Sequence, residues 1–75
     1  MTWQDYIESH PDIMHGAACI KGTRLPASVV LDNLAAGLTA DDLLREYPSL
    51  TPEAIQAALA YAAALARERV IHMPA

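Results

Sequence analysis

The sequence predicts a small, mainly α fold in which three helices follow a short extended segment. Three features predict it: apolar residues recur at helical spacing after residue 27, helix start and stop signals divide that region twice, and glycine and proline interrupt residues 1–26. We therefore expect one domain over residues 1–75, with an extended or hairpin head at 1–26, three helices within 27–69 and a tail at 70–75.

The first helix is predicted at about residues 27–36. Val30, Leu31 and Leu34 recur at the three- and four-residue spacings of one helix face. Gly37 follows, and glycine readily adopts the left-handed conformation that often comes after a helix end. The helix should therefore end just before Gly37.

The second helix is predicted to begin after Thr39 and to run to about Glu46. The Thr39 hydroxyl can cap free backbone N–H groups, and the two carboxylates that follow suit the positive end of the helix dipole. Pro48 disfavours helical geometry at the residue before it. The helix should end there for that reason.

The third helix is predicted to be long and to reach roughly Arg69. Thr51, Pro52 and Glu53 repeat the start signal with a capping hydroxyl, a proline at the first helical position and an early carboxylate. In the head, Gln4–Glu8 and Ala18–Ile20 are candidate short strands. Two such strands are not stable alone in water, so they should pack on the helices or on a second chain.

The third helix is apolar on more sides than an exposed helix normally is. Between residues 54 and 66, Gln56 is the only polar side chain apart from the hydroxyl of Tyr61. We expect Ile55, Leu59 and Ala62 to face the core and a second apolar side to bind a partner, although alanine also tolerates exposure to water. The candidate interface residues are Trp3, Tyr6, Ala57, Tyr61, Ala64, Leu65, Val70 and Ile71.

Composition and charge limit the function classes. The chain is 53% hydrophobic and 19% charged, too apolar for a disordered tail, and its net charge of −4 gives little attraction to phosphate backbones. No secretory signal or membrane-spanning stretch is present, and the lone cysteine suits a reducing compartment, so we expect a cytoplasmic protein. A chain this small should need help to be stable, which favours a homodimer or another partner.

A set of motifs across nearly the whole chain resembles a known family. The residues are Pro11, Ile13, Gly16, the run Ile20-Lys21-Gly22-Thr23-Arg24-Leu25-Pro26, Leu31, Gly37, the run Tyr47-Pro48-Ser49-Leu50-Thr51, Ile55 and Ala58-Leu59-Ala60-Tyr61. Together they resemble family 433 of the domains of unknown function. The family commonly has a basic residue and a proline where Ala17 and Ala18 stand here, so the basic loop loses a charge.

The resemblance implies a homeodomain-like or winged helix-turn-helix fold and a place among VapB-like antitoxins of type II toxin-antitoxin pairs. Such antitoxins bind and silence a PIN-like nuclease toxin, and the complex can repress its own operon. We therefore expect an antitoxin-like regulator. The alternatives are a stand-alone dimeric DNA-binding transcriptional regulator and a purely structural adaptor.

Lys21, Thr23 and Arg24 form a small basic turn, the best nucleic-acid candidate in the chain. Arginine offers a planar donor fork for phosphate, although Arg24 could instead pair with Asp12 or Asp32 while Thr23 bonds the local backbone. Any DNA binding should be weak, because the third helix offers few side chains that could read a base edge. The DNA-binding candidates are Lys21, Thr23, Arg24, Arg45 and Gln56.

No motif assigns a cofactor, a metal or a catalytic centre. His10, His15 and Cys19, with Asp12 as a fourth ligand, invite a zinc interpretation, but their spacing matches no zinc-finger pattern. Cys19 is better explained as a buried small hydrophobe. No combination of nucleophile, base and orienting group is recognisable, so we expect a protein that is not an enzyme and that holds neither metal nor cofactor.

Overall fold

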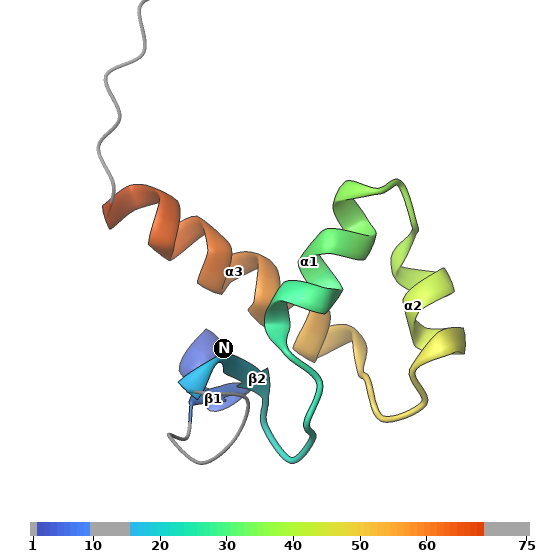
Figure 1. Ribbon diagram of the computed structural model, residues 1–75, viewed down its shortest axis with the longest axis horizontal. Coiled ribbons are helices and arrows are strands. Elements are labelled where there is room, and N and C mark those ends of the chain that lie inside the picture. Colours follow the sequence, from blue (N-terminus) through green and yellow to red (C-terminus); the bar gives the residue numbers. More distant parts are fainter. Residues whose placement is uncertain (1, 10–15, 69–75) are drawn as a thin grey trace, which may run out of the picture.

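A computed structural model describes residues 2–9 and 16–68, and it shows one long helix against which the other elements gather. Within those residues the elements are a 3₁₀ helix η1 (Trp3–Asp5), the strands β1 (Ile7–Ser9) and β2 (Ala18–Ile20), and the helices α1 (Ala27–Ala35), α2 (Ala40–Glu46) and α3 (Pro52–Glu68). Helix α3 contacts η1, β1, α1 and α2. Its C-terminal half extends away from α1 and α2 (Figure 1).

The predicted mainly α fold with three helices and a hairpin is confirmed. Helix α1 ends one residue earlier than predicted, α2 ends at Glu46 as predicted, and α3 is described as far as Glu68. Gly37 has a φ of 101° and follows α1, as its predicted role requires.

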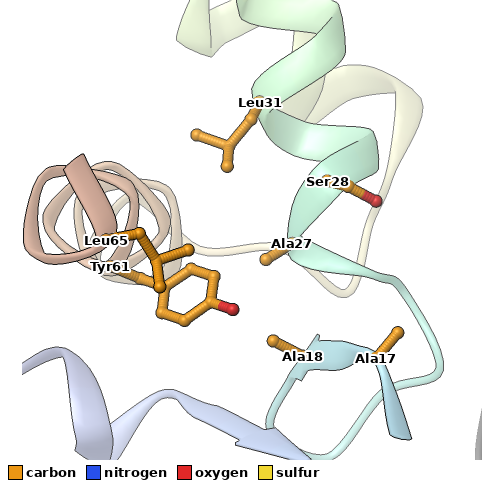
Figure 2. A pocket seen from close by; sticks show the side chains of 7 residues that line it. All are labelled: Ala17, Ala18, Ala27, Ser28, Leu31, Tyr61 and Leu65. Carbon is orange, nitrogen blue, oxygen red and sulfur yellow. The ribbon is translucent and has the colours of Figure 1, made fainter. Parts of the chain in front are cut away.

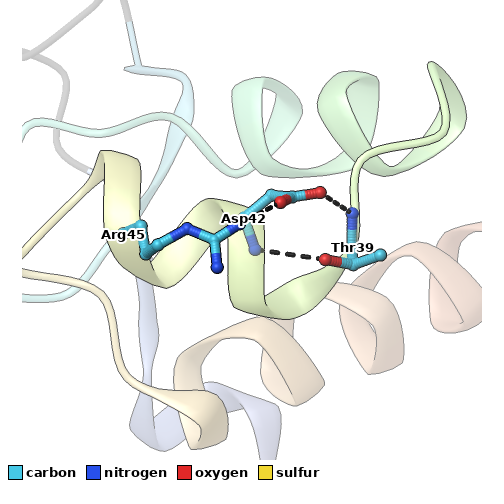
Figure 3. Close-up of polar contacts among 3 residues, drawn as sticks. All are labelled: Thr39, Asp42 and Arg45. Atoms are coloured by element: carbon cyan, nitrogen blue, oxygen red, sulfur yellow. Dashed lines mark hydrogen bonds and ion pairs between the residues drawn. The ribbon is translucent and has the colours of Figure 1, made fainter.

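Helix α2 begins with a capping box (Figure 3). The backbone N–H of Asp42 donates to the Thr39 hydroxyl at 3.1 Å, and the backbone N–H of Thr39 donates to the Asp42 carboxylate at 2.9 Å. The hydrogen bond from the Thr39 backbone N–H lowers the pKa of the Asp42 carboxyl most, and the Thr39 side chain and the Arg45 guanidinium lower it further. Thr51 caps α3 in a related way, since the Ala54 N–H donates to its hydroxyl at 3.1 Å.

The first predicted strand, Gln4–Glu8, is wrong in position. Residues Trp3–Asp5 form η1 instead, and β1 begins only at Ile7. The cause is local: the Asp5 N–H donates to the carbonyl of Thr2 at 3.1 Å, and the Thr2 hydroxyl donates to the Asp5 carboxylate at 3.0 Å. Hydrogen bonds between two polar residues at this spacing favour a turn over the extended conformation at the end of an isolated strand.

The hairpin adds one layer of apolar residues to the core. Strands β1 and β2 are antiparallel, with Ile7 opposite Ile20 and Glu8 opposite Cys19. Both isoleucines are buried, and Cys19 is a buried free thiol, as predicted. The buried core cluster consists of Ile7, Ile20, Ala27, Val30, Leu43, Leu50, Ala54, Ile55, Ala57 and Ala58.

Among the residues that the structure describes, no helix has the length and apolar character needed to cross a membrane.

Candidate protein-binding surface on the third helix

Helix α3 carries an exposed apolar side that faces away from the core. We call Leu59, Ala60, Ala63 and Ala66 the outer face of α3, and all four are exposed. Leu59 is the largest of them and is 43% exposed. The i, i+4 and i+7 spacing of Leu59, Ala63 and Ala66 places them on one side of the helix. Leu59 and the alanines at that spacing form an apolar strip, and the exposed polar side chain of Gln56 borders it on the N-terminal side.

The side of α3 that faces the core also continues beyond the part that the rest of the chain covers. Ala54, Ala58, Tyr61 and Leu65 follow one another at alternating four- and three-residue spacing, which keeps them on one side of the helix. Ala54 and Ala58 are buried, Tyr61 is half-buried and Leu65 is 46% exposed. Exposure therefore rises toward the C-terminal end of the same stripe.

A groove lies at the point where this stripe loses its cover (Figure 2). It has a volume of about 240 Å³ and is lined by Ala17, Ala18, Ala27, Ser28, Leu31, Tyr61 and Leu65. In Figure 2, Leu31 from α1 and Leu65 from α3 point toward it from opposite walls, and the Ser28 hydroxyl points away. The groove is therefore apolar and suits an aliphatic side chain.

An aromatic contact fixes the N-terminal residues to α3. The rings of Trp3 and Tyr61 meet edge to face, with their centroids 5.1 Å apart and an interplanar angle of 63°. This is a favoured arrangement for two aromatic rings. Trp3 and Tyr6 both pack against the core cluster of the same chain. Trp3, Tyr6 and Tyr61, which were predicted as interface candidates, therefore make contacts that stabilise the fold of this chain itself.

The predicted division of α3 into a core side and a partner side is wrong for two residues. Ala57 was predicted to contact a partner, but it is 0% exposed and belongs to the core. Leu59 was predicted to face the core, but it lies on the outer face. The reason is that η1 and β1 cover part of the helix, so the buried side is rotated from the predicted one. Ala64 is half-buried, and Val70 and Ile71 lie outside the described residues.

The DNA-binding candidates lie on separate elements. Lys21 and Arg24 are exposed in the turn after β2, Arg45 is on α2, and Gln56 is exposed on α3. The carboxylate of Asp42 binds the Arg45 guanidinium. No described contact brings these side chains together into one patch.

The Thr23 hydroxyl fixes the basic turn to the local backbone, as one of the two predictions for this turn required. It donates to the carbonyl of Ile20 at 2.7 Å and accepts from the Leu25 N–H at 3.0 Å. The predicted pairing of Arg24 with Asp32 is not found among the described ion pairs, and Asp12 lies outside the described residues. Arg24 is exposed in this turn.

For the metal hypothesis, the described residues contain no group of three or more His, Cys, Asp and Glu side chains able to hold an ion. His10, Asp12 and His15 lie outside them. Cys19 is buried, and its thiol donates to the carbonyl of Ala17 at 3.5 Å. The zinc site therefore stays an untested sequence hypothesis.

Comparison with known proteins places the chain in a family. Residues 7–62 match the family model described as "Protein of unknown function (DUF433)". The chain is a DUF433 protein. The matched region extends from β1 into α3 and includes the hairpin, α1, α2 and the capped start of α3. The family resemblance seen in the sequence is thus confirmed.

Two relatives of this DUF433 chain show the same relationship at the level of sequence and of fold. It is 38% identical over 61 residues to the uncharacterized protein y4eO of Sinorhizobium fredii, an alignment that covers 81% of this chain and 28% of that protein. The crystal structure of a DUF433 member from Anabaena variabilis superimposes with a TM-score of 0.79 at 31% identity. That match covers 87% of this chain and 64% of the other. The chain thus spans about a quarter of the length of the Sinorhizobium protein and a little under two thirds of the length of the Anabaena protein.

Proposed function

We propose that this DUF433 chain is an antitoxin-like regulator that binds a PIN-like nuclease through the outer face of α3 and neutralises it. The observation that supports the proposal is the exposure of Leu59 at 43% within an alanine strip that the chain's own core does not use. Contiguous exposed apolar surface on a small protein is typical of a protein-binding site. Small side chains around Leu59 allow the backbone of a partner to approach closely.

In the proposed function, the chain inhibits the nuclease by covering it sterically. The described part of the chain supplies no cluster of metal ligands, and the outer face holds only apolar side chains. A partner held there is blocked sterically and gains affinity from apolar burial. The proposed setting is the cytoplasm, where a homodimer would present two outer faces to two nuclease subunits.

The test begins with the genes that neighbour this one. The tagged chain is expressed together with the neighbouring PIN-like nuclease, and the copurified complex is assayed for RNA cleavage. We expect the nuclease to copurify and its activity to fall. The proposal is overturned if no neighbour encodes a PIN-like protein or if that nuclease neither binds nor loses activity.

A pair of variants locates the contact. Leu59→Asp puts a charge in the middle of the apolar strip and should abolish copurification, because the carboxylate would be buried without a partner. Ser49→Asp adds the same charge at an exposed position before α3 and should leave the complex intact. If the Leu59→Asp variant still retained the nuclease, the interface would have to lie outside the outer face.

A stand-alone DNA-binding regulator is the second candidate, and one observation favours it. The turn that holds Lys21 and Arg24 is exposed and is fixed in shape by Thr23. Exposed cations in a fixed turn suit phosphate contacts, which position a protein on DNA without reading sequence. The exposed carboxylate of Glu53 at the start of α3 opposes close approach of that helix to a phosphate backbone.

A further inference from the structure

We propose that α3 pairs with α3 of a second copy of this chain, antiparallel and centred on Ala60. The contact surface is a row of exposed residues along one side of the helix. We call it the Glu53–Arg67 strip, and it consists of Glu53, Gln56, Ala60, Ala63 and Arg67. The three- and four-residue spacing of its members keeps them on one side of α3.

The two charged residues make the Glu53–Arg67 strip complementary to itself. Glu53 lies seven residues before Ala60, and Arg67 lies seven residues after it. Seven residues are about two helical turns, or about 10 Å along the axis. When two such helices run antiparallel about a two-fold axis at Ala60, the Glu53 carboxylate of each copy meets the Arg67 guanidinium of the other. A parallel pair would place like charges together, so the charges select the antiparallel orientation.

Both charges are available for a contact with a second copy. Glu53 and Arg67 are exposed on α3. Neither takes part in an ion pair or a side-chain hydrogen bond among the residues that the structure describes, whereas Arg45 is already paired with Asp42. An ion pair with a second copy therefore breaks no described contact within the chain.

The middle of the strip allows two helices to come close together. Ala60 and Ala63 are exposed, and each projects only a methyl group from the backbone. Helix axes pack about 8 Å apart where the side chains at the contact are small. Gln56, four residues before Ala60, lies across from Ala63 and Ala64 of the second copy, so a long side chain meets two small ones. The strip is therefore complementary in shape as well as in charge.

The strip adjoins the outer face of α3 but leaves its leucine free. The two surfaces share Ala60 and Ala63, whereas Leu59 and Ala66 each lie about 100° around the helix from the strip residue that follows them. The exposed side chain of Leu59 is therefore not part of the dimer contact. Formation of this dimer does not depend on a nuclease, so different substitutions test the two surfaces.

The test reverses the charges of the strip in the full chain. Glu53→Arg and Arg67→Glu are made singly and together, and analytical ultracentrifugation measures the dimer dissociation constant of each variant. We expect each single change to weaken the dimer about tenfold, because it replaces two ion pairs by two repulsive pairs, and the double change to restore it. A native chain that stays monomeric, or single variants that dimerise as tightly as the native chain, would overturn the proposal.

Matched variants locate the two-fold axis. Ala60→Glu places two like charges beside the axis and should abolish the dimer, whereas Ala66→Glu adds the same charge outside the strip and should leave it intact. Both positions are exposed and glutamate is a good helix former, so circular dichroism should show the native helix content. Leu59→Asp should keep the dimer whatever its effect on nuclease binding. A dimer that survives Ala60→Glu would contradict the antiparallel contact.

Discussion

At the residue scale, the polar contacts that matter most are local. The capping box of Thr39 and Asp42 satisfies free N–H groups at the start of α2, and Thr51 does the same for α3. Each uses residues three apart in sequence, which is why inspection of the sequence finds the helix starts. The contact between Trp3 and Tyr61 is different in kind, because no local pattern links two residues so distant in the chain.

Replacing Thr39 by alanine should lower the free energy of unfolding by about 1 kcal/mol, because the Asp42 N–H then loses its acceptor. Urea unfolding followed by circular dichroism measures this change. Ala40→Ser, at the next position, should leave the midpoint nearly unchanged. A Thr39→Ala variant as stable as the native chain would mean that water replaces the cap without loss.

The Asp42 carboxylate should make part of the stability depend on pH. Its pKa is lower in the folded chain than its usual value of 3.8, so the ionised form stabilises the fold above that value. This contribution is lost as the pH falls through the lowered folded-state pKa. Thermal unfolding of Asp42→Asn should therefore show a smaller loss of Tm on acidification than the native chain does. Asp41→Asn, which removes a carboxylate outside the box, should keep the native acid dependence.

The contact between Trp3 and Tyr61 should contribute measurably to stability. Trp3→Ala removes both the ring pair and the apolar surface that η1 places on the core, and we expect a loss of about 2 kcal/mol. Thermal or urea unfolding measures it, with the exposed neighbour change Gln4→Ala as the control. Equal stability of the two variants would show that η1 does not hold to α3 in solution.

At the element scale, helix positions could be predicted and helix faces could not. The bounds of α1 and α2 follow from caps, glycine and proline, which act within a few residues. The buried side of α3 depends on what covers the helix, and η1 with β1 covers a part that the sequence pattern left open. In a helix made mostly of alanine, the pattern that normally distinguishes the sides is weak. This is why Ala57 was predicted to contact a partner and Leu59 to face the core, whereas the structure shows the reverse.

Enlarging one alanine on each side of α3 tests the observed faces directly. Ala57→Leu overfills a site that is 0% exposed and should cost about 1–3 kcal/mol of stability. Ala63→Leu adds the same atoms on the exposed outer face and should change stability by no more than about 0.5 kcal/mol. Urea unfolding compares the two. A larger loss of stability for Ala63→Leu than for Ala57→Leu would indicate that Ala57 lies on the partner-binding surface after all.

At the scale of the whole molecule, the described residues form a mainly helical domain held together through α3, and the net charge limits which partners it binds. The net charge is −4, and Lys21 and Arg24 are the cations exposed in a fixed turn. The composition alone predicted weak affinity for nucleic acid. The groove could not be predicted, because Ala18, Leu31 and Leu65 come from β2, α1 and α3 and meet only in the folded chain.

Binding to duplex DNA should be weak and only moderately sensitive to salt. Lys21 and Arg24 from each of two chains could neutralise about four phosphates, so the slope of log K against log salt should be no steeper than about −4. Fluorescence anisotropy over a salt series measures it, and Arg24→Ala should make the slope shallower. A slope several units steeper would require a basic surface beyond this turn and would favour the stand-alone DNA-binding regulator.

The contact between Trp3 and Tyr61 also sets an order of events during protein synthesis. Trp3 is synthesised well before Tyr61, the residue whose ring it packs against. The hairpin therefore lacks the cover that α3 gives to β1, where Ile7 is buried, until that helix has been synthesised. A chain that ends before Tyr61 therefore lacks the helix surface that completes its core, and we expect it to be more readily degraded than the full chain.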